Sequence, residues 1–258
     1  MTRGIWNRET VALLILAALL PIAVAWLIAG GTGAAARLVL VLLVVAVWQV
    51  IWMFGRALAP SWAGVATALG IAMLAPVDLG PAALLLATSF GVVAAELAFG
   101  GWGRNVVNPG AVTLVFLGFG FPVAGWPELA VQLGWAAIAS ALLGVALGVM
   151  SWRLFVGAGA ALAATHLAGI NLSAGFAPIA VVLVVLVADP VVNAATHAGR
   201  YLVGGLYGGL IALFLLYWQE AAPAQIAVSA ALLSSLSAPL IDEIAIAIWL
   251  ARRRQRHG

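Results

Sequence analysis

Long apolar runs, separated by short polar breaks, fill nearly the whole length of the chain. A helix of about 20 apolar residues crosses a bilayer, so the pattern predicts a multi-span, all-α membrane protein. The breaks contain clusters of Gly and Pro, which end helices. We predict ten transmembrane helices, at residues 10–29, 37–54, 62–75, 81–99, 109–121, 128–150, 152–168, 175–188, 200–218 and 225–241.

The ten predicted helices divide into two halves of five around residues 122–127. Because five is an odd number, the two halves have opposite orientations in the membrane, which is the inverted-repeat plan of many transport proteins. We therefore expect a single membrane domain over residues 1–258, with a first repeat at about residues 5–121 and a second at about residues 128–251.

Three predicted helices, the third, fifth and eighth, are shorter than a straight span requires. The third and the eighth hold matching positions in the two halves. The third ends in the sequence APVD at residues 75–78, and the eighth ends in ADPV at residues 188–191. Short spans at matching positions indicate a site between the two repeats.

The amino-acid composition excludes a soluble domain and any site that needs cysteine. Hydrophobic residues make up 66% of the chain and charged residues 7%, which leaves no polar stretch long enough for a soluble domain. The chain contains no cysteine, so it has no disulfide and no thiolate-bound metal or iron–sulfur cluster. The apolar run after Thr10 has the length of a full span and no small-residue cleavage site after it, so we expect no cleavable signal peptide.

The arginines indicate how the helices are oriented. With a cytoplasmic N-terminus and ten helices, ten of the eleven arginines lie on the cytoplasmic side, and Arg37 is the exception. The basic balance therefore reflects topology, and no nucleic acid is expected as a partner. Tryptophans such as Trp102 lie near the predicted helix ends, as in an aromatic belt. We expect a multi-pass protein of the bacterial inner membrane with both termini in the cytoplasm.

The first polar stretch lies at residues 100–122 and reads GGWGRNVVNPGAVTLVFLGFGFP. Its glycines permit turns that a side chain would prevent, and Asn108 before Pro109 is a plausible N-cap. Polar, non-helical backbone is tolerated at membrane depth only where protein or a watery cavity surrounds it. The alternative is an ordinary capped loop between two helices.

The second polar stretch lies at residues 188–200 and reads ADPVVNAATHAGR, on the same side of the membrane by the predicted topology. Glu96 lies inside an apolar span, where an ionisable group suggests a function, and we expect Arg104 or Arg200 to pair with it. The alternative for Glu96 and for Asp189 is a structural pair or a helix cap. We expect the two stretches to meet between the halves, with a candidate binding cluster of Glu96, Arg104, Asn105, Asn108, Asp189, Thr196 and Arg200.

The remaining histidines and carboxylates do not indicate a cofactor or catalytic site. His166 and His197 fall on opposite sides of the membrane in the predicted topology, so they do not share a haem iron. Asp242 and Glu243 precede an apolar run and four arginines, which fits an amphipathic helix end on anionic lipid. We see no nucleophile triad, phosphate loop or metal site, and therefore expect no catalytic residues in this chain.

The two stretches together resemble motifs of RnfD and NqrB, membrane subunits of the Rnf and sodium-pumping NADH–quinone reductase complexes. RnfD carries GGLGxNxFNPAM…SFP, then TDPVT…TNRGR, and later PLID. The corresponding residues here are Gly100, Gly101, Gly103, Asn105, Asn108, Pro109, Phe121 and Pro122, then Asp189, Pro190, Val191, Thr196, Gly199 and Arg200, then Pro239, Leu240, Ile241 and Asp242. The order and internal spacing of the motifs are preserved.

The resemblance implies ten helices in two inverted repeats and a place in a flavin-based, ion-coupled electron-transfer complex. It also implies an FMN linked to the threonine of an S-x-A-T motif in a long outer loop after the fifth helix. Here that loop has shrunk to the residues between Pro122 and Glu128, and no S-x-A-T sequence occurs in the chain. We therefore expect no covalent FMN. Val106 and Gly110 also depart from the family pattern.

Three functions remain open. The first is an RnfD/NqrB-like subunit of an ion-translocating oxidoreductase, which uses a non-covalent flavin or quinone or serves the ion path. The second is a cofactor-free accessory subunit packed against another redox or photosynthetic membrane complex. The third is a stand-alone channel or transporter. The first two require other membrane subunits as partners, and all three require lipid.

Overall fold

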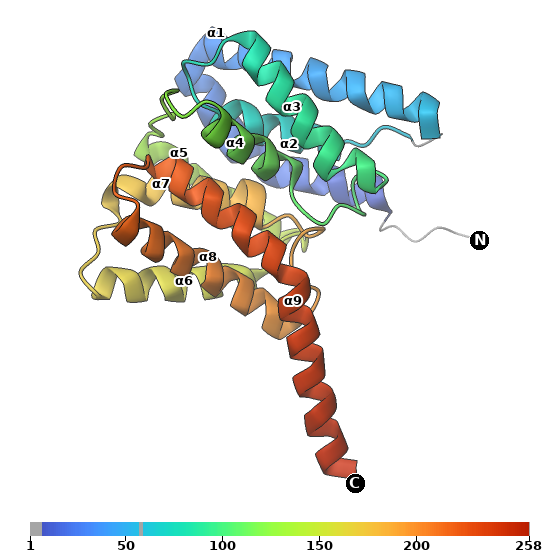
Figure 1. Ribbon diagram of the computed structural model, residues 1–258, viewed down its shortest axis with the longest axis vertical. Helices are drawn as coiled ribbons and strands as arrows, with labels where there is room; N and C mark the ends of the chain where they lie inside the picture. Colours follow the sequence, from blue (N-terminus) through green and yellow to red (C-terminus); the bar gives the residue numbers. More distant parts are fainter. Residues whose placement is uncertain (1–6, 57–58, 258) are drawn as a thin grey trace.

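The computed structural model describes residues 7–56 and 59–257, and within these ranges it contains helices, turns and loops but no strand (Figure 1). The helices are α1 (Arg8–Arg56), α2 (Ala63–Leu74), α3 (Pro81–Ala95), η1 (Leu97–Phe99), α4 (Pro109–Gly120), α5 (Val131–Ala146), α6 (Trp152–Leu167), η2 (Ser173–Gly175), α7 (Phe176–Val182), η3 (Leu183–Val187), α8 (His197–Tyr217) and α9 (Pro223–His257).

The 49-residue α1 consists of two helices joined at Gly31. The backbone there has φ 55° and ψ −140°, outside the helical region and in a range that glycine adopts more readily than other residues. Figure 1 shows the chain reversing direction at this point. The break predicted between the first two spans is therefore confirmed.

Helix lengths support the membrane class. Within the described residues, four helices are long and apolar enough to cross a membrane: residues 8–55, 81–99, 197–217 and 223–251. As expected for the third, fifth and eighth helices, α2 and α4 have 12 residues each, and α7 has 7 followed by 5 in η3. Most side chains of α2 and α7 are buried, whereas α4 is buried mainly over its first part and ends at the exposed residues Phe119 and Gly120.

The two halves pack against each other through a few of their helices. In Figure 1 the helices α1 to α4 form the upper part of the bundle and α5 to α9 the lower part. Contacts between the halves join α1 to α5, α4 to α9, and α2 to η3. The buried core includes the two short helices α2 and α7, and the polar stretches begin where η1 and η3 end.

Arg37, the one arginine expected on the outer side, serves the end of α2. Its guanidinium donates hydrogen bonds to the carbonyl oxygens of Ala75, at 2.8 Å, and of Pro76. The last carbonyls of a helix have no partner within the helix, so a charged donor satisfies them. Arg37 thus has a local structural role at the end of α2.

Candidate functional site

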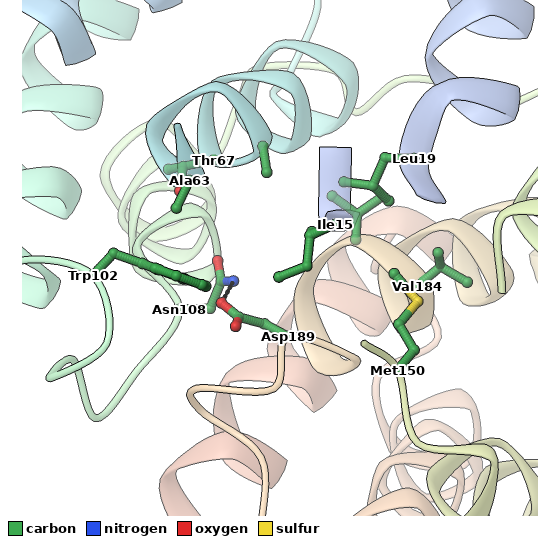
Figure 2. A pocket seen from close by; sticks show the side chains of 11 residues that line it. Ile15, Leu19, Ala63, Thr67, Trp102, Asn108, Met150, Val184 and Asp189 are labelled. Carbon is green, nitrogen blue, oxygen red and sulfur yellow. Dashed lines mark hydrogen bonds between the residues drawn. The ribbon is translucent and has the colours of Figure 1, made fainter. Parts of the chain in front are cut away.

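Asn108 joins the two halves of the protein. Its side-chain oxygen accepts hydrogen bonds from the backbone N–H groups of Gly110, at 2.9 Å, and Ala111, at 3.3 Å, which confirms the predicted N-cap of α4. Its amide nitrogen donates to Oδ2 of Asp189 at 3.2 Å (Figure 2). The two polar stretches therefore meet, as expected, through this pair of side chains.

Asp189 lies just beyond η3, with its carboxyl enclosed although part of the residue is exposed. Its other oxygen, Oδ1, accepts from the backbone N–H of Val191 at 3.0 Å. Burial raises the pKa of the Asp189 carboxyl, and hydrogen bonds from Val191, Asn108 and the side chain of Trp102 oppose that rise. The carboxyl is thus held by neutral donors rather than by an arginine.

Trp102 lies between the two buried carboxylates. Its side chain interacts with Asp189, its backbone N–H donates to the carboxylate of Glu96, and its carbonyl oxygen accepts from Arg8 at 3.2 Å. Sequence reasoning placed Trp102 in an aromatic belt, but the residue is only 5% exposed. Nothing in the sequence separates this tryptophan from those at the surface except the glycines on either side of it.

Glu96 follows α3 and is only 2% exposed. Arg8, at the start of α1, attracts it electrostatically, and Asp189 repels it. The expectation that Arg104 or Arg200 pairs with Glu96 was wrong. Arg8 was missed because it lies far from Glu96 in the sequence. Its ion pair is with the neighbouring Glu9, whose Oε1 lies 3.0 Å from Arg8 Nε, and its attraction for Glu96 is additional to that pair.

The glycines of the first stretch give its loop the shape that brings Trp102 inward. Gly100, Gly101 and Gly103 have φ values of 100°, 89° and 96°, a region that other residues rarely adopt. Asn105 holds the loop, since its side chain accepts from Gly103 N–H at 3.1 Å and donates to the Val107 carbonyl at 3.2 Å.

Arg104 is exposed and its guanidinium lies beside Gly100. The structure therefore separates the residues expected in one cluster. Asn105 shapes the loop and Arg104 faces outward, whereas Glu96, Asn108 and Asp189 are grouped around Trp102.

Thr196 and Arg200 have a different partner from the one expected. Thr196 caps α8 by accepting from Gly199 N–H at 3.0 Å. The Asp242 carboxylate accepts from the Ala195 and Thr196 N–H groups, at 2.6 and 3.0 Å, and from the Thr196 hydroxyl. Arg200 lies near that carboxylate and donates from Nε to the Ala194 carbonyl at 3.0 Å.

The second polar stretch is therefore divided between two contacts. Asp189 faces Asn108, and the segment that leads into α8 is fixed by Asp242 of α9. The third motif, residues 239–242, thus supplies the carboxylate that organises the end of the second.

We expect Asp242→Ala to lower the free energy of unfolding by about 2 kcal/mol, because three donors lose a charged acceptor at a partly exposed site. Hydrogen exchange at the amides of residues 195–199 should become faster, and the melting temperature of the protein should fall. Glu243→Ala removes the exposed neighbouring carboxylate and serves as the matched control. Equal effects of the two substitutions would contradict the assigned role of Asp242.

Two small cavities flank Trp102. One, of about 20 Å³, is lined by Asn108 and Asp189 together with Thr67, Met150 and Val184 (Figure 2). The other, also about 20 Å³, is lined by Glu96, Arg8, Gln49 and other residues. Each has room for about one water molecule.

A pocket for a flavin or quinone ring would require several hundred Å³. The Glu96–Asp189 cluster therefore does not fit such a ring in this structure. Within the described residues, no group of three or more His, Asp or Glu side chains is arranged to hold a metal ion.

The fold and the cluster define a class: a helical membrane protein whose halves are joined by polar side chains between short, buried helices. A model of the NQR2, RnfD, RnfE family matches residues 5–132, which include the whole first polar stretch. The chain is thus an RnfD/NqrB-like protein, and the resemblance stated from its motifs is confirmed. The second and third motifs lie outside the matched residues. No curated protein matches the sequence.

Proposed function

We propose that this protein is a membrane subunit of an ion-coupled electron-transfer complex of the Rnf or Nqr type. The observation that carries the proposal is the family match over the first polar stretch, in which Asn108 reaches Asp189 of the second half. Subunits of that kind work within larger assemblies, and the short loops of this chain do not form a catalytic domain of their own.

In this function, the cluster of Glu96, Trp102, Asn108 and Asp189 serves the ion path. Two enclosed carboxyls, each beside a water-sized cavity, can hold a proton or a small cation, whereas the cavities have no room for a cofactor ring. Arg8, which also forms an ion pair with Glu9, attracts the Glu96 carboxylate and so offsets part of the negative charge. We therefore assign non-covalent flavin or quinone binding, if the complex carries it, to surfaces outside this cluster.

The proteins that purify with the chain test the proposal. The chain is extracted in mild detergent through an affinity tag, and the bound proteins are identified by mass spectrometry. Rnf-type or Nqr-type redox subunits are expected. A different redox or photosynthetic complex would replace the proposal with an accessory role, and an active protein without partners would indicate a stand-alone channel or transporter.

The accessory role is the second candidate, and one observation favours it. The segment between α4 and α5 is short, running from Phe121 to Ala130, and hydrogen bonds join it to the residues that follow α2. Val77 N–H donates to the Gly125 carbonyl at 2.9 Å, and Gly125 N–H donates to Asp78 at 3.3 Å. This loop closes the outer end of α2 and so has a structural role.

We further propose ten transmembrane helices in two inverted repeats, with both termini in the cytoplasm. The break at Gly31, the short helices α2 and α7, and the contacts of α1 with α5 and of α4 with α9 support this arrangement. Reporter fusions at Met1 and at Gly258 are both expected to give the cytoplasmic signal. A periplasmic signal from either fusion would disprove the arrangement.

The protein is expected to carry no covalent flavin, because the chain lacks an S-x-A-T sequence. A denaturing gel viewed under ultraviolet light should show no fluorescent band at the mass of this chain. The intact mass should equal that of the polypeptide, with no increment for an FMN phosphoester. A family member that contains the S-x-A-T motif provides the positive control on the same gel.

A further inference from the structure

The last part of α9 leaves the helix bundle. This helix has 35 residues, which at 1.5 Å per residue gives about 52 Å, well beyond the ~30 Å hydrocarbon core of a bilayer. Pro239 lies inside it, where a proline removes a backbone hydrogen bond and favours a bend. Figure 1 shows the segment after this point, residues 240–257, extending away from the other helices; we call it the arm.

The arm exposes large apolar side chains on several sides. Ile244, Ile248 and Trp249 are 50%, 48% and 56% exposed, and Ile246 and Leu250 are exposed as well. Ile244 and Ile248, four residues apart, share one face of the helix, whereas Ile246 lies on the opposite face. A protein groove covers one face of a helix, whereas acyl chains surround it, so this distribution favours lipid as the main neighbour.

Charge at the end of the arm points to the kind of lipid. Four of the five residues at positions 252–256 are arginines, and the guanidinium of Arg253 lies over the ring of Trp249 at 5.2 Å from its centroid. An aromatic ring followed by arginines is typical of a membrane interface, and clusters of arginine attract anionic headgroups. Glu243, at the beginning of the arm, is separated from this cluster by two turns of apolar helix.

A groove runs between the arm and the start of α8. It has a volume of about 650 Å³ and is lined mainly by apolar side chains, among them Leu202 of α8 and Ile244, Ile248 and Trp249 of the arm. Thr196 and His197 lie at its polar end. A groove of this size and character accommodates an acyl chain.

We infer that the arm is a binding site for anionic phospholipid. Residues 244–251 lie among the acyl chains of the cytoplasmic leaflet, one chain occupies the groove beside α8, and the arginines at positions 252–256 bind the phosphate headgroups. Asp242 fixes the base of the arm to α8 through Ala195 and Thr196, so the groove keeps its shape.

The absence of cysteine allows a direct test with the full chain in lipid nanodiscs. Ala247→Cys introduces one thiol on an exposed position of the arm for an environment-sensitive fluorophore. In nanodiscs containing phosphatidylglycerol, lipids with a shallow doxyl group are expected to quench the fluorophore strongly. An arm that remains unquenched in these discs would overturn the inference.

Native mass spectrometry of the detergent-solubilised protein tests the headgroup preference. The wild type is expected to bind phosphatidylglycerol in preference to phosphatidylcholine. Arg252→Gln, Arg253→Gln, Arg254→Gln and Arg256→Gln together should reduce that preference at least about tenfold. The matched control replaces the same four arginines by lysine and should retain it, because the charge is kept.

Two further outcomes would overturn the inference. The first is an unchanged preference in the glutamine variant, which would mean that the arginines do not select the lipid. The second is the loss of a dimer or of a bound protein when Ile244 and Ile248 are replaced by serine, with phosphatidylglycerol binding unchanged. That result would identify a protein as the occupant of the arm.

Discussion

Gly204→Ala is expected to lower the melting temperature of the purified protein sharply, whereas Gly209→Ala, on the same helix, should leave it unchanged or raise it. A Cβ atom at Gly204 would lie 2.1 Å from the carbonyl oxygen of Leu154 and 2.9 Å from the backbone nitrogen of Ala158. At Gly209 a Cβ atom would meet nothing within 4 Å. The two substitutions therefore differ only in the space available to one methyl group.

The size of the effect follows from what the methyl group meets. Overpacking typically costs about 1–3 kcal/mol. Here the obstacle is the backbone of α6, which cannot rotate aside as a side chain can, so we expect a loss of at least about 3 kcal/mol. At Gly209 the gain in helix propensity is about 1 kcal/mol. Small residues in membrane helices allow this close approach of two backbones.

Gly157→Ala provides a second view of the same contact from α6. A Cβ atom at that position would lie 2.2 Å from the carbonyl oxygen of Tyr201, while Gly159 has open space. Thermal unfolding in detergent, followed by circular dichroism, should therefore group Gly157→Ala with Gly204→Ala, and Gly159→Ala with Gly209→Ala. Similar melting temperatures for all four variants would show that α6 and α8 are not held this closely.

The sequence allowed the helices to be placed but not the partners of their polar side chains. Length and turn residues identify spans, and Asn108 before Pro109 carries a local signal that one helix begins there. The helices are apolar on nearly every side, so no periodic stripe shows which face meets which neighbour. The hydrogen bonds of Arg8 to Trp102 and of Thr196 to Asp242 depend on helix packing, which local patterns do not encode.

Two helix boundaries also differ from the span limits predicted from local sequence patterns. The last transmembrane span was predicted to end at residue 241, with an amphipathic helix end after it, and α9 includes both parts and continues to His257. Asp242 is polar because it serves the neighbouring helix, not because its own helix stops. Similarly, α8 begins at His197 rather than at the predicted residue 200, since Thr196 provides the cap.

Asn108→Asp is expected to destabilise the contact between the halves by about 3–5 kcal/mol at neutral pH. The introduced carboxylate can still cap α4, so the start of that helix is retained. It cannot donate to Asp189, however, and places a second negative charge where the amide now lies 3.2 Å from Oδ2. Asn108→Ser keeps a capping oxygen without the charge, and should cost only about 1 kcal/mol.

The effect of Asn108→Asp should depend on pH. Like charges and burial both raise the pKa of a carboxyl, so the pair takes up a proton at a higher pH in the folded protein than in the unfolded chain. The penalty is therefore largest above the raised pKa and decreases as the pH falls through it, when one carboxyl becomes a donor. The melting temperature of Asn108→Asp should lie well below that of the wild type at pH 8. The difference between the two proteins should be smaller at pH 5.

The double variant Asn108→Asp with Asp189→Asn tests whether the instability of Asn108→Asp comes from its contact with residue 189. It restores one donor and one carboxylate between the same two positions, and is expected to recover most of the stability that Asn108→Asp loses.

Asp189→Asn alone leaves two amides that still bond to each other, so the protein should assemble. Because it removes a carboxylate from the proposed ion path, that single variant should lose coupled ion uptake in membrane vesicles while electron transfer continues. If Asp189→Asn assembles and still takes up ions, Asp189 serves only to hold the two halves together.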